Sequence, residues 1–175
     1  MVSVEIPLII SVLTLGVIAG GFNISKIIAY QEVNGILALK YPLLLLTLLL
    51  VYPAEVMMNP LTLTNAETEI VEGPFTEYSG RRLALLELAH LTERFILASL
   101  IVDLFFHLDF GIPLANIIYN LTCSLFIIVF YTFIEAVSSR IRIIEAVKWY
   151  IVFTNIICII GLIQAVVERT FLRVV

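Results

Sequence analysis

Residues 41–82 read YPLLLLTLLLVYPAEVMM followed by NPLTLTNAETEIVEGPFTEYSGRR, so a long apolar run gives way abruptly to a polar, acidic segment. The polar segment carries four glutamates within eleven residues, at Glu67, Glu69, Glu72 and Glu77. Loops that only join membrane helices are usually short and indifferent in composition, whereas an acidic, glycine-containing loop between apolar runs suggests a site. We therefore expect the function to reside in residues 59–82 and in the ionisable residues of the flanking helices.

The composition is that of a membrane protein. The 175 residues are 61% apolar and 14% charged, with a mean hydropathy of +1.09, whereas a soluble domain is about 25% charged. Apolar runs of about 17 to 25 residues, long enough to cross about 30 Å of hydrocarbon, lie at 4–20, 41–58, 83–106, 113–137 and 147–168. The sequence predicts an all-α integral membrane protein, a single domain over 1–175 with about five transmembrane helices. A structured acidic loop, 59–82, joins the second helix to the third.

The charge pattern predicts the location and orientation of the chain. Because the first residues carry Glu5 and no small-residue cleavage site follows, we expect the first helix to be retained rather than removed as a signal peptide. Basic residues near the membrane favour the cytoplasmic side for the acidic loop of this cell-membrane protein. The side of the acidic loop carries five basic residues, and the opposite side carries four. The five are Arg81, Arg82, Arg140, Arg142 and Lys148, and the four are Lys26, Lys40, Arg169 and Arg173. A net charge of −4 without a basic run argues against nucleic acid as a partner.

Carboxylates occur where lipid is expected. Six lie within or at the edges of the predicted helices: Glu5, Glu55, Glu87, Glu93, Asp103 and Glu135. An ion at the centre of a bilayer costs about 2.5 to 3.5 kcal/mol on insertion scales, so such groups usually face protein or trapped water and often serve transport. We favour proton or ion handling for them, because a lone carboxylate is a costly way to make a helix contact. Glu5 and Asp103, with His107 four residues after Asp103, have the alternative of reaching the membrane interface.

Helical spacing groups the polar residues into faces. In 83–106, Glu87, His90 and Arg94 share one side and Glu93 lies a turn from His90, an arrangement that permits charge neutralisation or proton relay. The helix at 113–137 carries a polar stripe that requires a polar partner or a file of water: Asn116, Asn120, Ser124, Tyr131 and Glu135. For the Asn and Ser positions we favour hydrogen bonds between helices.

The chemistry of an independent enzyme is missing from the sequence. It contains no nucleophile paired with a base, no phosphate-binding glycine loop and no metal-ligand cluster. Cys123 and Cys158 lack the spacing of a zinc or iron–sulfur site and are interpreted as packing residues. We expect no catalytic centre, metal or cofactor in this chain. An independent small transporter is disfavoured because the five predicted spans show no internal repeat.

A longer pattern runs through the acidic loop. It comprises Ala54, Glu55, Pro60, Ala66, Glu67, Glu69, Val71 and Gly73, and then Glu77, Tyr78, Ser79, Gly80 and Arg82. This pattern resembles A-E-x-x-R-x-P-F-D-x-x-E-A-E-x-E-L-V-x-G and E-Y-S-G-x-R of the membrane subunit that anchors the peripheral arm of respiratory complex I. That protein, the H subunit of the bacterial complex, has counterparts in energy-converting membrane-bound hydrogenases. The opening MVSVEIPL, Gly21-Phe22-Asn23 and Glu135-Ala136 resemble further family patterns, so the likeness extends over essentially the whole chain.

Departures from the family pattern bear on the type of complex. Thr62 and Asn65 replace the usual Asp and Glu of quinone-reducing members, Met58 replaces Arg, and His90 replaces a further Glu. They favour a membrane-bound hydrogenase or related ferredoxin-driven complex, with a quinone-reducing NADH dehydrogenase subunit as the alternative. The chain resembles the C-terminal half of the family member, which implies either that another chain supplies the N-terminal half or that this chain is a split or truncated version of the subunit.

The resemblance implies a non-catalytic subunit of an ion-translocating oxidoreductase that docks the peripheral arm and provides a proton path. Its implied partners are hydrophilic electron-transfer subunits with iron–sulfur clusters, other membrane subunits including antiporter-like ones, and lipid. The candidate proton-path residues are Glu5, Glu55, Glu67, Glu69, Glu72, Glu77 and Glu135. A secondary polar face comprises Glu87, His90, Glu93 and Arg94. The alternative function is a purely structural membrane anchor for the peripheral arm.

Overall fold

The computed structural model describes residues 2–56, 58, 80–138, 148 and 150–174, and within these the chain is helical without a strand. Its elements are α1 (Val2–Ala19), α2 (Ile24–Asn34), α3 (Leu37–Lys40), α4 (Pro42–Glu55), α5 (Arg81–Phe105), α6 (Pro113–Val137), η2 (Tyr150–Thr154), which is a π-helical turn, and α8 (Asn155–Val174). The acidic loop lies outside the described residues except for its last three positions, 80–82.

Helices lie close to each of the five apolar ranges, but they differ in their capacity to cross a membrane. α6 and the segment Val152–Thr170 are long and apolar enough to span one. The pair Glu5–Ala19 and Ile24–Asn34, bent by 60° at a short break, is a third candidate, and α4 is apolar but shorter. The described residues therefore supply two or three candidate spans by length and composition.

The segment between the first two predicted helices is itself helical. Gly20, with φ 76°, ends α1, and the side chain of Asn23 caps α2 by accepting a hydrogen bond from the Ser25 N–H at 3.1 Å. The hydropathy pattern alone predicts no helix in this region. Its contribution to the fold is Gln31, which is buried and reaches α5.

Gln31 satisfies the backbone at the end of α5. Its amide nitrogen donates to the carbonyl oxygens of Asp103 and Leu104 at 2.9 and 3.0 Å, and its amide oxygen accepts from the His107 N–H at 3.2 Å. The last carbonyls of a helix lack partners within the helix. α2 therefore fixes the position at which α5 stops.

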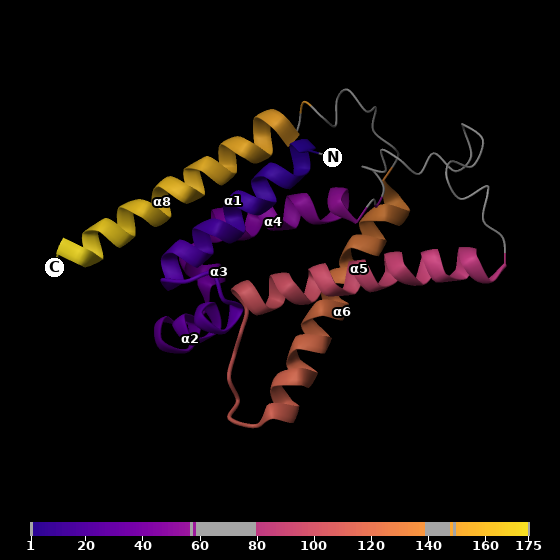
Figure 1. Cartoon of the computed structure of the whole chain (residues 1–175), viewed down its shortest axis with the longest axis horizontal. Helices are drawn as coiled ribbons and strands as arrows, with labels where there is room; N and C mark the ends of the chain where they lie inside the picture. The colour runs from indigo at the N-terminus through magenta and orange to yellow at the C-terminus, as the bar shows by residue number, and fades with distance from the viewer. Residues whose placement is uncertain (1, 57, 59–79, 139–147, 149, 175) are drawn as a thin grey trace.

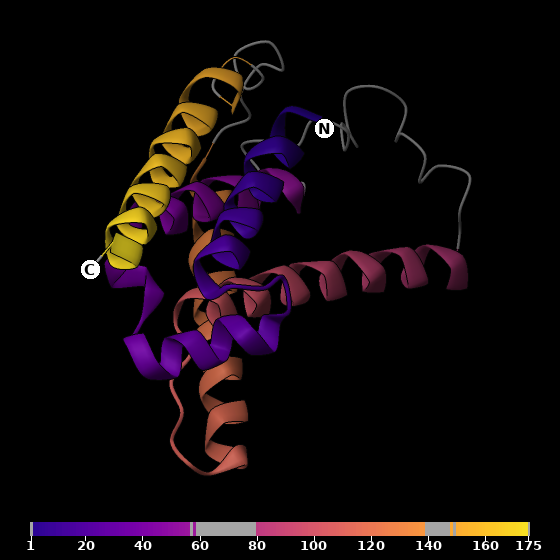
Figure 2. The same ribbon diagram turned by 60° about the vertical axis from the view of Figure 1, so that its left-hand side comes forward.

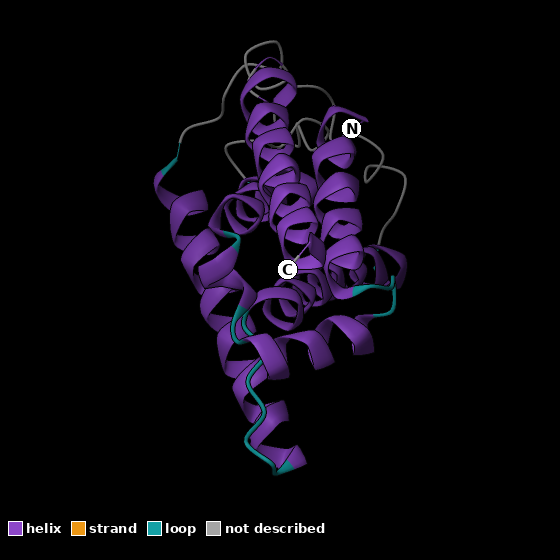
Figure 3. Cartoon of the chain, turned by 90° about the vertical axis from the view of Figure 1, so that its left-hand side faces the viewer, coloured by secondary structure: helices purple, strands orange, loops and turns teal. Residues whose placement is uncertain are grey.

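Two groups of helices make up the fold. α1, α4 and α8 pack against one another along their lengths (Figures 1 and 2), and Gly161 of α8 lies so near α4 that an added Cβ would come within 2.9 Å of Leu44. α5 crosses α6 and packs through its C-terminal half, while its N-terminal half projects from the bundle (Figure 1). Figure 3 shows that helices make up nearly all of the described chain and that short loops join them. The shared core contains Leu15, Leu44, Tyr52 and Phe105.

A proline and a tyrosine join α4 to α6. Pro53 lies inside α4 and has no N–H, so the carbonyl of Leu49, four residues earlier, loses its partner within the helix. The hydroxyl of Tyr131 in α6 donates to that carbonyl at 2.6 Å. Tyr52 stacks on Tyr131 with ring centroids 4.9 Å apart and donates its hydroxyl to the carbonyl of Arg94 in α5 at 3.1 Å. The two tyrosines thus connect α4, α5 and α6.

Replacing Tyr131 with Phe should lower the free energy of unfolding by about 1 to 3 kcal/mol, because the buried Leu49 carbonyl is left unpaired. In a Pro53→Ala variant, the N–H of residue 53 is restored and can bond to the Leu49 carbonyl. Tyr131→Phe should then lower the free energy of unfolding by about 1 kcal/mol or less. Thermal unfolding of the purified protein measures both, and Tyr119→Phe on the same helix is the matched control. Equal losses in the two backgrounds would contradict the pairing.

Asp109 organises the connection between α5 and α6. Its Oδ1 accepts hydrogen bonds from the side-chain amide of Asn116 at 2.8 Å and from the Gly111 N–H at 2.9 Å. The bond from Asn116, and then that from Gly111, hold the pKa of this exposed carboxyl below its ordinary value. The charged form of Asp109 is therefore the form that stabilises the turn.

A lowered pKa in the folded state means that the stabilisation by Asp109 is present above the ordinary Asp pKa of about 3.9 and is lost as the pH falls through the lower folded value. The melting temperature of the wild type should exceed that of Asp109→Asn at neutral pH, and the difference should vanish in acid. Melting curves of both proteins from neutral pH to about pH 3 test this, and a difference independent of pH would refute it.

Candidate functional site

Carboxyl groups from three helices come together where α4 ends. Glu55 is the last residue of α4 and is half-buried. Glu5, in the first turn of α1, and Glu93, on α5, both lie within electrostatic range of Glu55. We call Glu5, Glu55 and Glu93 the carboxylate cluster. Negative charges on Glu5 and Glu93 repel one on Glu55, so a proton bound by Glu55 relieves the repulsion.

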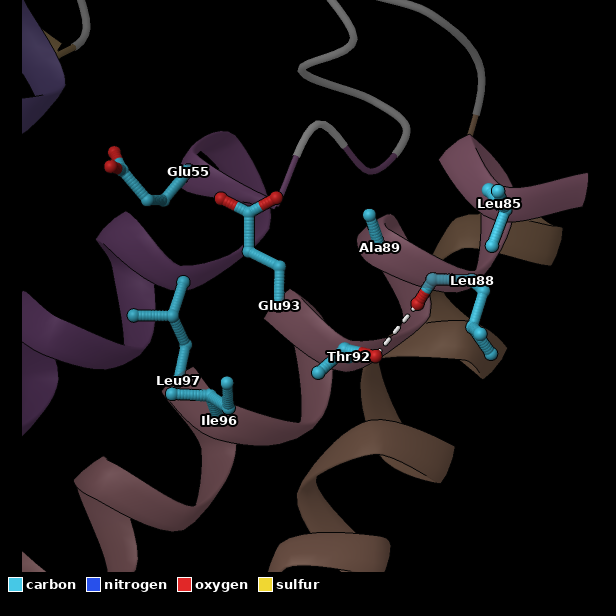
Figure 4. Close-up of a pocket in the computed structure, with 8 residues that line it drawn as sticks. All are labelled: Glu55, Leu85, Leu88, Ala89, Thr92, Glu93, Ile96 and Leu97. Atoms are coloured by element: carbon cyan, nitrogen blue, oxygen red, sulfur yellow. Dashed lines mark hydrogen bonds between the residues drawn. The ribbon is translucent and has the colours of Figure 1, made fainter. Parts of the chain in front are cut away.

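A cavity of about 550 Å³ opens beside the cluster. Glu55, Glu93 and Thr92 are its polar lining residues, and Leu85, Leu88, Ala89, Ile96 and Leu97 complete it. Figure 4 shows Glu93 rising from α5 toward the end of α4 that carries Glu55, with the apolar side chains arrayed along α5. The cavity therefore combines an apolar wall with two carboxylates at one end.

An ion pair connects α5 with α6 next to the cluster. Nη1 of Arg94 lies 3.8 Å from Oε2 of Glu135, and both side chains are about one-quarter exposed, at 27% and 23%. Nδ1 of His90 lies 3.6 Å from Oε2 of Glu93. Glu93 and Arg94 are adjacent in sequence. The ion pair and the carboxylate cluster therefore each have one residue on the same turn of α5. Nε of Arg94 is buried and has no hydrogen-bond partner within the part of the chain that the structure describes.

The structure keeps one contact that helical spacing predicts and adds one that it does not. His90 lies next to Glu93, as the spacing on the secondary face predicts. Glu93 also lines the cavity together with Glu55 of α4. Glu87 is exposed on the projecting half of α5. Spacing within one helix could not reveal which of its turns meets the end of α4. Four further predicted residues, Glu67, Glu69, Glu72 and Glu77, lie outside the described residues.

The polar stripe on α6 has polar partners. Tyr131 reaches the backbone of α4, and Glu135 pairs with Arg94. Asn120 bonds to Ser99 and to Asp103 of α5, contacts that the pattern of each helix taken separately did not reveal. Asn116 bonds instead to Asp109 in the connection between α5 and α6, and Ser124 bonds to Asn120 of its own helix. The expected hydrogen bonds between helices are therefore made by Asn120, not by Asn116 or Ser124.

Metal-binding groups do not cluster in the described residues, among which no set of three His, Cys, Asp or Glu side chains could hold an ion. Cys158 is buried with its Sγ 3.4 Å from Oγ of Ser11, and Cys123 is a free thiol. In the described residues, the groups available for chemistry are therefore ionisable side chains, which line the two cavities.

Comparison with known proteins gives the family. The model of the NADH dehydrogenase family matches residues 1–166. The chain belongs to this family. It is 40% identical over 105 residues to the H subunit of NADH-quinone oxidoreductase from Bacillus thuringiensis (strain Al Hakam), Bacillus cereus (strain AH187) and Bacillus anthracis (strain A0248). Each of these alignments covers 60% of this chain and 31% of the relative.

The fold has a close counterpart among solved structures. A chain in the structure of the membrane-bound sulfane sulfur reductase, an archaeal respiratory membrane complex, superposes with a TM-score of 0.81 at 25% identity, covering 94% of this chain and 56% of that one. The resemblance to the complex I membrane subunit is thus confirmed, and this NADH dehydrogenase family member is a membrane-embedded relative of respiratory-complex subunits. The partial coverage fits the expectation that the chain corresponds to half of such a subunit.

The Arg94–Glu135 pair should stabilise the contact between α5 and α6. A double-mutant cycle with Arg94→Met, Glu135→Gln and the combined variant should give a coupling energy of about 0.5 to 3 kcal/mol, as expected for residues in contact. Thermal stability of the subunit in its complex provides the readout. Glu87→Gln combined with Arg94→Met is the control cycle and should be additive. Additive behaviour of the first pair would show that the 3.8 Å approach contributes nothing.

Proposed function

We propose that this chain is a non-catalytic, energy-coupling subunit of a complex I-like, ion-translocating membrane oxidoreductase. In this role it docks a peripheral electron-transfer arm and provides carboxylates for the proton path. The observation that carries the proposal is the cavity at the end of α4, which Glu55 and Glu93 both line, with the exposed Glu5 of α1 within electrostatic range of Glu55. Membership of the NADH dehydrogenase family supports the same role.

The position of the cluster suggests how coupling works. The acidic loop begins at Asn59, shortly after Glu55, so its glutamates at 67, 69, 72 and 77 are in sequence reach of the cluster. A proton delivered by the loop changes the charge of the cluster, and His90 beside Glu93 offers the next group able to accept it. The Arg94–Glu135 pair on the same turn of α5 responds electrostatically to that change. Electrons travel in partner subunits that hold iron–sulfur clusters.

The hydrogenase or ferredoxin-driven type is our preferred class of complex. Met58, Thr62, Asn65 and His90 replace residues usual in quinone-reducing members, and the solved structure with a similar fold is a sulfane sulfur reductase. The alternative is a quinone-reducing NADH dehydrogenase subunit. It is supported by the Bacillus relatives, which are named as H subunits of NADH-quinone oxidoreductase.

In the proposed topology the chain crosses the membrane about five times, with residues 59–82 on the cytoplasmic side. Phe126, Phe133 and Val137 leave much of α6 apolar and exposed, a surface that suits lipid, antiporter-like subunits or a chain that supplies the other half of the fold. The peripheral arm would dock on the cytoplasmic side, where the acidic loop and the projecting half of α5 are close in sequence.

Replacing Glu55 with Gln should uncouple ion transport from electron transfer. Electron transfer should persist, while ion transport driven by it should fall about tenfold or more, because removing a group that transfers protons typically costs at least this much. The measurement is ion uptake per electron transferred in native membrane vesicles. Glu87→Gln, an exposed carboxylate on the projecting half of α5, is the matched control and should leave the ratio unchanged. Glu67→Gln and Glu69→Gln should behave like Glu55→Gln.

A purely structural anchor is the second candidate, favoured by the projecting half of α5, where Leu85, Leu88 and Leu91 are exposed beside Arg81 and Arg82. An anchor predicts that Leu88→Glu releases the peripheral arm on purification and that every complex still assembled couples normally. Normal coupling in assembled Glu55→Gln complexes would reject the proton role and favour the anchor.

A further inference from the structure

A second polar cavity lies between α5 and α6, about 15 Å along α5 from Glu93 at 1.5 Å per residue. Its volume is about 380 Å³, and its polar lining residues are Ser99, Asp103, His107, Asn116, Tyr119 and Asn120. None of the three residues of the carboxylate cluster lines this cavity, so its polar side chains form a separate group.

Asp103 is held in the cavity by one defined hydrogen bond. Nδ2 of Asn120 donates to its Oδ1 at 2.5 Å. The amide is oriented by its other end, because Oδ1 of Asn120 accepts a hydrogen bond from the hydroxyl of Ser99 at 2.9 Å. The hydroxyl of Ser124 donates mainly to the backbone carbonyl of Asn120, at 2.7 Å. The Ser99 donor on the amide oxygen leaves the NH₂ group to face Asp103. The amide supports the carboxylate without neutralising its charge.

The surroundings of Asp103 contain few other ionisable groups. His107, one turn later on α5, and Tyr119 of α6 line the same cavity, and His107 acts on Asp103 electrostatically. α2 contributes Gln31, an uncharged amide that bonds to the backbone carbonyl of Asp103. None of the lining residues comes from α4. A half-buried carboxyl group thus faces a polar space with one imidazole beside it.

We propose that this cavity holds water and that Asp103 exchanges protons with it. In one direction the carboxylate takes a proton from a hydronium ion, leaving a neutral carboxylic acid and a water molecule, and the reverse step returns the proton to water. Six polar side chains line one part of the cavity, and the rest of its wall is apolar: Phe95, Val102, Leu108, Ile117 and Leu121. Its volume is large enough for several water molecules, which the polar side chains can bind. The neutral acid can still accept the hydrogen bond from Asn120, so both forms fit the site. This assignment is independent of the proton role of Glu5 and Glu55.

Dicyclohexylcarbodiimide tests the proposal, because it reacts with protonated carboxyl groups in apolar surroundings. Native membranes containing the whole complex are treated across a range of about pH 5 to 9, and the adduct on each carboxylate of this chain is quantified by mass spectrometry. We expect an adduct on Asp103 that falls about tenfold per pH unit above its midpoint, as for a single titrating carboxyl. Asp109, exposed and held in its charged form, is the internal control and should remain unlabelled.

Two variants sharpen the result. Asp103→Asn should remove the adduct at this position alone. Asn120→Leu removes the donor that supports the charged carboxylate, so the adduct on Asp103 should persist to higher pH. An Asp103 that stays unlabelled at every pH would overturn the proposal. Protection from labelling by NaCl, but not by choline chloride at the same pH and ionic strength, would also overturn it and assign the cavity to sodium.

Discussion

The hydroxyl of Tyr131 closes a gap that Pro53 opens in the hydrogen-bond ladder of α4. In lipid, an apolar helix gains little by packing on another apolar helix, so defined polar bonds decide how helices associate. This bond fixes α6 against α4, and the adjacent Tyr52 fixes α4 against α5. The relative positions of these three helices, and therefore of every carboxylate they carry, depend on that pair of aromatic residues.

The consequence for the site is that charges on different helices act together. Glu55 ends α4, Glu93 lies on α5, and Glu135 reaches α5 through Arg94. Glu55 and Glu93 lie within electrostatic range of each other, so protonating one changes the energy of the other. Glu135 is connected to them through Arg94, the neighbour of Glu93 on α5.

The sequence predicted the helices better than it predicted their contacts. Apolar runs located α1, α4, α5 and α6 to within a few residues, since hydropathy is a property of consecutive positions. The last predicted span, 147–168, corresponds less closely to η2 and α8, which cover 150–174. α2 and α3 were missed because their polar residues hide the apolar face, and the structural role of Gln31 depends on α5, which is more than forty residues away. Likewise, Glu93 was grouped by helical spacing, which reports neighbours on one helix and cannot report that α4 ends beside it. The family resemblance compensated in part, because its opening pattern singled out Glu5 and its loop pattern singled out Glu55.

α5 has a mechanical property that its contacts imply. It is a single helix of 25 residues, about 37 Å long. Among the described residues it packs mainly through its C-terminal half, while its N-terminal half projects from the other helices (Figure 1). It lines the first cavity from Leu85 to Leu97, mostly on the projecting half, and the second from Phe95 to Asp103, on the packed half. Because one continuous helix forms part of the wall of both cavities, a displacement of its projecting half moves the wall of the first cavity and is passed along the helix toward the second.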